Sequence, residues 1–149
     1  MFLVNEDPQI RDNKIRRWLK SEPSVSLIIA TANFEWTVSR AVILLSPSTN
    51  RELRIMLEKV YGIERYKDFW RDEVSRKRML KTLPEIVKDW QGVLSAFESR
   101  NKVVHGRDRC TRNMASPKVE VLLNAASEIR DYCNSLGGNF QGRLPIRRK

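Results

Sequence analysis

The chain has 149 residues, 41% hydrophobic and 31% charged, and its 28 Lys and Arg against 18 Asp and Glu give a net charge of +10. This length suits one domain that hides about two-thirds of its unfolded surface, so folding requires neither disulfides nor a structural metal, and the composition excludes a disordered chain. The basic excess favours a polyanionic partner, nucleic acid first and an acidic protein second, without distinguishing RNA from DNA.

Cysteine usage and hydropathy narrow the class of protein further. Cys110 and Cys133 lack metal-binding spacing, and a single histidine excludes a His-rich zinc site within one chain. We therefore predict reduced thiols, no metal and no cofactor. The most apolar run, Val38 to Leu45, is too short to span a bilayer, and the N-terminal segment MFLVNEDPQI is acidic where a secretory signal is basic. The expected location is the cytoplasm, with no membrane partner.

The first predicted elements are two helices. Apolar residues at helical spacing predict one helix over about 9–20 and a second over about 24–45, separated by a break at Pro23. The second segment is the most apolar of the chain and is predicted to be the central core helix. Glu35 is the acidic exception within it.

The middle of the chain is predicted to contain short elements. Pro47 ends the core helix, and Thr49 with Glu52 makes a capping box that opens a short helix to about residue 60. Residues 61–81 mix aromatic and charged side chains and are predicted to form short helices and turns. Their aromatic residues either belong to the core, which helical spacing favours, or form a surface on which bases stack.

The last two helices are marked by their caps. Thr82 and Glu85 form a second capping box, which predicts a helix running to His105 and ended by Gly106. A basic loop over 106–115 follows. Ser116-Pro117 then predicts the start of the final helix, with an N-cap followed by proline at the first position.

These elements define an all-helical chain. Gly137-Gly138 stops the final helix, and no segment shows the alternation of a strand. We predict an up-and-down bundle of four to five helices in a single domain, residues 1–138, followed by a basic, flexible tail over residues 139–149.

The segment with candidate chemistry is Arg100-Asn101-Lys102-Val103-Val104-His105. An arginine, a polar residue directly after it and a histidine five residues on resemble the motif of HEPN-domain ribonucleases, in particular those with Arg-Asn at its front. The surroundings are similar over about 24–135: a long apolar helix bearing an acidic residue, a helix running into the motif, and a closing helix near a proline. The resemblance implies a HEPN-like bundle and a ribonuclease site shared across a homodimer.

The residue types suit RNA cleavage without a metal. RNA carries its own nucleophile, the 2′-hydroxyl, so the reaction needs a base, an acid and positive charge beside the phosphorane. Histidine exchanges protons near neutral pH, which suits His105 to act as acid and base. Arg100 can contact two phosphate oxygens through its fork of donors, and Asn101 can orient the phosphate or the histidine.

A two-fold dimer resolves two difficulties of a single chain. One chain supplies one histidine, although the reaction uses two proton-transfer groups. In a helix, Asn101 and His105 share a face, whereas Arg100 and His105 point about 140° apart. Crossing two copies of the helix brings both sets of side chains into one groove.

Each candidate residue also has an ordinary structural interpretation. His105 near a helix end is typical of a residue that interacts with the helix dipole, and Asn101 of a helix cap. Arg100 is equally suited to a surface ion pair. Glu35 either supports Arg100 or faces solvent. The basic residues near the motif are either contacts to the RNA backbone or a solvated charge run; they are Lys102, Arg107, Arg109 and Arg112.

The leading hypothesis is a metal-independent endoribonuclease that cleaves RNA by 2′-hydroxyl transphosphorylation at a composite dimer site. Because small HEPN ribonucleases are commonly toxins, the resemblance implies a toxin of a toxin–antitoxin or antiphage defence system, with an antitoxin or another defence-system protein as partner. Gly106 follows His105 where toxins paired with nucleotidyltransferase antitoxins typically carry Tyr, which counts against that partnership. The alternatives are a non-catalytic HEPN module for dimerisation or RNA binding, and a basic helical DNA-binding protein.

Overall fold

The computed structural model describes residues 6–148, and these residues are helical with no strand. The predicted all-helical class is confirmed for this part of the chain. Residues 1–5, half of the N-terminal segment compared above with a secretory signal, lie outside the described residues.

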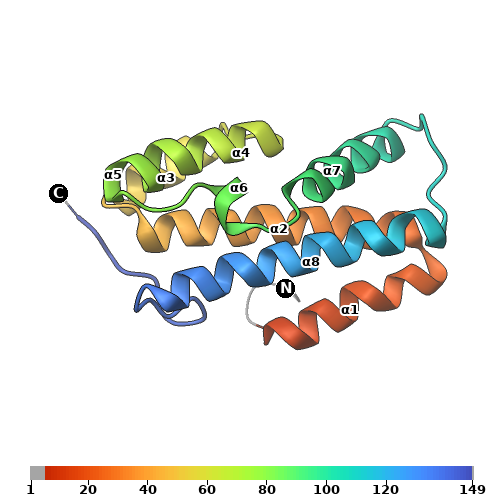
Figure 1. The fold of residues 1–149 in the computed structure, drawn as a ribbon, viewed down its shortest axis with the longest axis horizontal. Coiled ribbons are helices and arrows are strands. Elements are labelled where there is room, and N and C mark those ends of the chain that lie inside the picture. Colours follow the sequence, from red (N-terminus) through yellow and green to blue (C-terminus); the bar gives the residue numbers. More distant parts are fainter. Residues whose placement is uncertain (1–5, 149) are drawn as a thin grey trace.

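Four long helices form the body of the molecule, and consecutive ones reverse direction (Figure 1). They are α1 (Pro8–Ser21), α2 (Pro23–Leu45), α7 (Trp90–Val104) and α8 (Arg112–Ser135). The centre is formed by α2 and α8, which lie along each other, with α1 on one side and α7 on the other. Shorter elements cover the C-terminal half of α2. These are α3 (Asn50–Leu57), α4 (Ile63–Trp70), the π-helical turn η1 (Arg71–Ser75), α5 (Arg76–Arg78) and α6 (Leu83–Ile86).

The central position of α2 follows from its composition. Leu27, Phe34, Val38 and Val42 are fully buried, and the helix packs against all three other long helices. By length and composition α2 is also long and apolar enough to cross a membrane, so it extends well beyond the short run considered above. Because 56% of its most apolar window is buried inside the protein, it behaves as a core helix.

The helix that carries the motif is shorter than predicted. The continuous helix expected from Thr82 to His105 is interrupted, because Val87 is extended and α7 starts afresh after Asp89. The Asp89 carboxylate accepts a hydrogen bond from the Gly92 amide at 2.9 Å and caps the new helix. A Cβ on Gly92 would lie 2.3 Å from that carboxylate, so a larger residue there would displace the capping side chain.

The final helix starts earlier than predicted. Thr111, rather than Ser116, is its N-cap and accepts a hydrogen bond from the Met114 amide at 3.2 Å. Pro117 therefore lies inside α8, where it costs one backbone hydrogen bond. The basic loop shortens to the residues between α7 and α8, and Arg112 belongs to the first turn of α8.

Charged contacts fasten α1 to α8 and α2. Arg16 donates two hydrogen bonds to the Glu120 carboxylate, at 2.7 and 3.0 Å. Arg11 is fully buried, with its guanidinium 4.8 Å from the centre of the Trp36 ring. Arg130 is nearly buried and faces a carboxylate of α1 at 4.0 Å. Arg16 thus holds the C-terminal half of α1 beside the N-terminal half of α8, and Arg130 faces the N-terminal half of α1 from the C-terminal half of α8.

The C-terminal segment packs against the bundle, which differs from the flexible tail expected at 139–149. Phe140 is fully buried, and Arg40 of α2 donates one hydrogen bond to its carbonyl at 2.7 Å. Further along, Arg147 donates to the carbonyls of Ile43 and Leu44 at 2.7 and 2.8 Å. The last carbonyls of a helix have no partner within it, so this guanidinium caps the C-terminus of α2.

We predict that Arg147→Met lowers the free energy of unfolding by about 1.5–3 kcal/mol, the range for a lost hydrogen bond to a charged group. The carbonyls of Ile43 and Leu44 then lose their donor. Urea denaturation measures the effect, and Arg148→Met, which removes an exposed neighbouring charge, is the matched control. Equal stability of the two variants would contradict the assigned cap.

Candidate active site

The end of α7 fixes where the histidine lies. His105 is the C-cap, Gly106 has a φ of +66°, and the chain turns back on itself. The Gly106 amide donates to the Val103 carbonyl at 3.1 Å and the Arg107 amide to the Lys102 carbonyl at 2.8 Å. This is the Schellman pattern, which requires a residue of positive φ directly after the cap. The predicted role of Gly106 in ending the helix is confirmed, and it leaves His105 exposed at the tip of α7.

Arg100 lies on the opposite side of the same helix end, where α7 faces α2. It is half-buried, and its Nη1 donates to Oδ1 of Asn101 at 2.9 Å. Its Nε is buried and has no hydrogen-bond partner among the described residues. A buried donor without an acceptor costs free energy, so the guanidinium retains unused capacity to donate.

Glu35 of α2 lies close enough to Arg100 for their charges to interact. Burial raises the pKa of the Glu35 carboxyl, and the Arg100 guanidinium opposes that shift. Within the described part of the chain the two side chains form no ion pair at 4 Å or less. Neither predicted alternative describes Glu35 fully: its side chain is partly buried rather than free in solvent, and it forms no direct ion pair with Arg100.

One further residue beside Glu35 was not predicted as part of this environment. Tyr66 of α4 is buried against α2, and this burial raises the pKa of its phenol. A hydrogen bond with Ser39 lowers the same pKa, and the charge of Glu35 raises it further. The sequence marks Tyr66 only as one of several aromatic residues at helical spacing. Its position beside Glu35 depends on how α4 folds back onto α2.

We predict that Glu35→Gln stabilises the protein at neutral pH and not in acid. Because the folded-state pKa is raised, the folded protein binds a proton that the unfolded chain releases, and the wild type loses stability as pH rises from 4.5 through the folded-state pKa. The glutamine variant does not pay this cost. Urea denaturation at a series of pH values measures the difference, which should vanish below pH 4.5. A constant difference at every pH would contradict the assignment.

The structure brings some motif residues together and separates others. Arg100 and Asn101 touch, whereas the His105 side chain makes no hydrogen bond with either of them in the described part of the chain. Asn101 and His105 are both exposed and four residues apart, so they share one face. Asn101 is not a helix cap, because that position belongs to His105. A single chain therefore presents histidine and arginine on different sides of α7.

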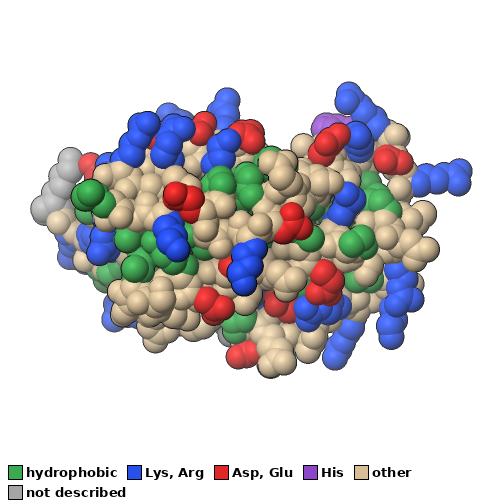
Figure 2. Space-filling view, in the orientation of Figure 1, with side chains coloured by type: hydrophobic (Ala, Val, Ile, Leu, Met, Phe, Trp, Pro, Cys, Tyr) green, Lys and Arg blue, Asp and Glu red, His purple; other side chains and the backbone are tan. Residues whose placement is uncertain are grey.

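Charged side chains of both signs lie at this end of the molecule (Figure 2). Figure 2 shows the single histidine at the edge of the protein with Lys and Arg side chains beside it. Lys102 is paired with Glu98 at 2.9 Å. By contrast Arg107, Arg109 and Arg112 are exposed and form no ion pair with any described residue. Three of the four predicted RNA contacts are therefore available to an external anion.

Surface hollows lie elsewhere on the described part of the chain, and five of them are lined without Arg100, Asn101 or His105. Of the three motif residues, Asn101 and His105 are exposed and Arg100 is half-buried. Among the described residues, no three His, Cys, Asp or Glu side chains are arranged to hold a metal ion. The metal-free reaction stays a prediction.

Comparisons of the chain with protein-family models, with curated proteins and with solved structures gave no match.

Proposed function

We propose that the protein is a metal-independent endoribonuclease with a HEPN-like fold, whose site forms where two copies bring their α7 ends together. The observation that carries the proposal is the exposed His105 at the end of α7, one helical turn from Asn101. It is followed in the chain by the exposed Arg107, Arg109 and Arg112, which form no ion pair with any described residue. The resemblance of the Arg-Asn-x-x-x-His segment to HEPN ribonucleases supports it, as does the all-helical chain.

The proposed reaction uses only groups that this chain supplies. The 2′-oxygen of RNA forms a bond to phosphorus while the bond to the 5′-oxygen breaks. One imidazole takes the proton of the 2′-hydroxyl, and a second gives a proton to the leaving 5′-oxygen. Arg100 stabilises the doubly charged phosphorane, a contact worth about 3–4 kcal/mol by analogy with oxyanion holes.

The dimer supplies what one copy lacks. One chain holds one histidine, and its Arg100 and His105 lie on different sides of α7. A two-fold axis beside the helix end places the histidine of each copy opposite the other copy's motif.

The test of the proposal is cleavage of a single-stranded RNA in excess EDTA, with the products separated by end chemistry. We expect 2′,3′-cyclic phosphate ends, and no cleavage of the same strand with 2′-deoxyribose at the cut site, because the nucleophile is then missing. Light scattering at micromolar concentration should give the mass of a dimer. Cleavage that requires a divalent ion, or that proceeds on the deoxy strand, would overturn the mechanism.

The biological setting is proposed from the resemblance. A small RNase of this type acts in the cytoplasm as a toxin of a toxin–antitoxin or antiphage system, and an antitoxin or other defence-system protein neutralises it. RNA binding without turnover by the intact chain would instead favour the non-catalytic dimerisation or RNA-binding module.

A further inference from the structure

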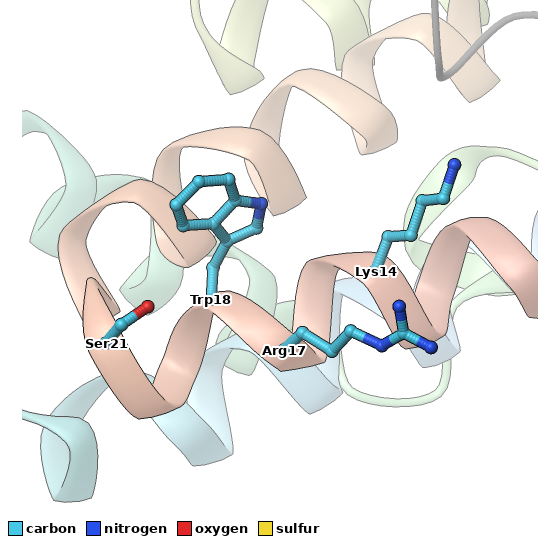
Figure 3. A pocket seen from close by; sticks show the side chains of 4 residues that line it. All are labelled: Lys14, Arg17, Trp18 and Ser21. Atoms are coloured by element: carbon cyan, nitrogen blue, oxygen red, sulfur yellow. The ribbon is translucent and has the colours of Figure 1, made fainter.

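A stripe of α1 combines an exposed indole with cations. Ile10, Lys14, Arg17, Trp18 and Ser21 recur at the spacing of one helical face. Trp18 is 42% exposed, and a surface hollow beside it is lined by Lys14, Arg17 and Ser21 as well (Figure 3). The other three tryptophans are buried or half-buried, whereas this indole is exposed beside a hollow, where a flat partner can reach it.

The charges around Trp18 indicate the chemistry of its partner. Lys14 forms an ion pair with Glu6, but Arg17 and Lys20 are exposed and have no ion-pair partner among the described residues. The nearest acidic residue that follows Trp18 in the sequence is Glu22, at the end of α1. An aromatic face flanked by unpaired cations matches a nucleotide, in which a flat base lies next to a phosphate.

This face lies at the same end of the molecule as the candidate active site. The α1 C-terminus and the loop between α7 and α8 are both at that end of the bundle (Figure 1). An RNA strand leaving the motif can therefore follow Arg107, Arg109 and Arg112 toward α1.

We propose that Trp18 is a stacking site for an unpaired base of single-stranded RNA, with Arg17 holding the adjacent phosphate. The inference rests on the proposed function, because it extends the same substrate beyond the cleavage site. A second copy of the chain fits this face less well. In a two-fold contact the patch meets itself, so the unpaired cations of both copies would gather around one indole pair.

The test measures binding without cleavage, in the full chain carrying His105→Ala. A labelled 12-nucleotide single-stranded RNA is titrated and its anisotropy recorded, together with the same strand in a duplex. In this background Trp18→Ala should weaken single-strand binding about 5- to 100-fold, the range expected for one stacked base. Trp18→Phe, which keeps a ring, should retain most of the affinity. Duplex binding should not respond, because paired bases are not free to stack.

The arginine and the controls complete the experiment. Arg17→Ala should lower the slope of log affinity against log salt by about 0.7, the contribution of one phosphate contact on a single strand. Ile55→Ala, which removes an exposed apolar side chain of α3, should leave binding unchanged. The proposal would be overturned if Trp18→Ala left the affinity for single-stranded RNA unchanged. It would also be overturned if Trp18→Ala abolished the dimer while each chain still bound RNA with the same affinity. Trp18-dependent binding, together with no RNA cleavage by the chain that keeps His105, would support this site and contradict the proposed catalysis.

Discussion

His105→Ala is expected to reduce the rate of RNA cleavage by about 100- to 10,000-fold, the range associated with a positioned general acid or base. The side chain is exposed at the tip of α7 and packs against no core residue, so the substitution removes the imidazole without opening a cavity. The backbone contacts that end the helix are made by Gly106 and Arg107 and persist in the variant. The rate of cleavage in EDTA at matched protein concentration measures the effect.

Two controls separate chemistry from charge and folding. Arg143→Ala removes an exposed cation from the C-terminal segment, at the other end of the molecule from the motif, and should leave cleavage nearly unchanged. Urea denaturation should give the same midpoint for His105→Ala and wild type. Arg100→Ala should lower the rate about 100- to 1,000-fold, as when one preorganised donor to a charged transition state is removed. Full activity in either motif variant would exclude the assigned roles.

The sequence predicts best the helices that have a clear capping box or a clear apolar pattern at helical spacing. The capping box of Thr49 and Glu52 forms as predicted, and the apolar pattern of α2 places it in the core. At α8 the predicted start at Ser116-Pro117 was wrong, because Thr111 caps the helix five residues earlier. A proline is tolerated inside the helix there because the turn gained before it adds more backbone hydrogen bonds than the proline removes.

The candidate site shows the same limit of prediction from sequence. Sequence spacing places Arg100 and His105 about 140° apart on a helix. The structure adds that Arg100 is half-buried and His105 is exposed. The environment of Arg100 was only partly predictable, since the burial of Glu35 and the approach of Tyr66 arise from segments distant in sequence. The packing of the C-terminal segment was not predictable either. Its anchors, Phe140 and Arg147, are isolated residues in a basic stretch whose partners are the end of α2.

Phe34→Ala is expected to lower the free energy of unfolding by about 3–5 kcal/mol. Phe34 is fully buried in α2, one residue before Glu35, and meets Phe97 of α7 edge to face with ring centres 5.8 Å apart. Truncation removes a large apolar surface from the core, leaves a cavity and deletes the aromatic contact that seats α7. Since domains of this size are stable by about 5–15 kcal/mol in total, the variant should be close to unfolding at elevated temperature.

Urea denaturation with a common slope measures this loss, and Ile55→Ala on the exposed side of α3 should change stability by less than about 0.5 kcal/mol. A loss below about 1 kcal/mol for Phe34→Ala would mean that α7 is not seated on α2 as the structure has it. The position of the motif would then not be fixed relative to α2, because Phe97 lies one turn before Arg100 on the same helix. Cleavage by the folded fraction of Phe34→Ala adds a second readout. If α2 positions Arg100 through this contact, activity per folded molecule falls together with stability.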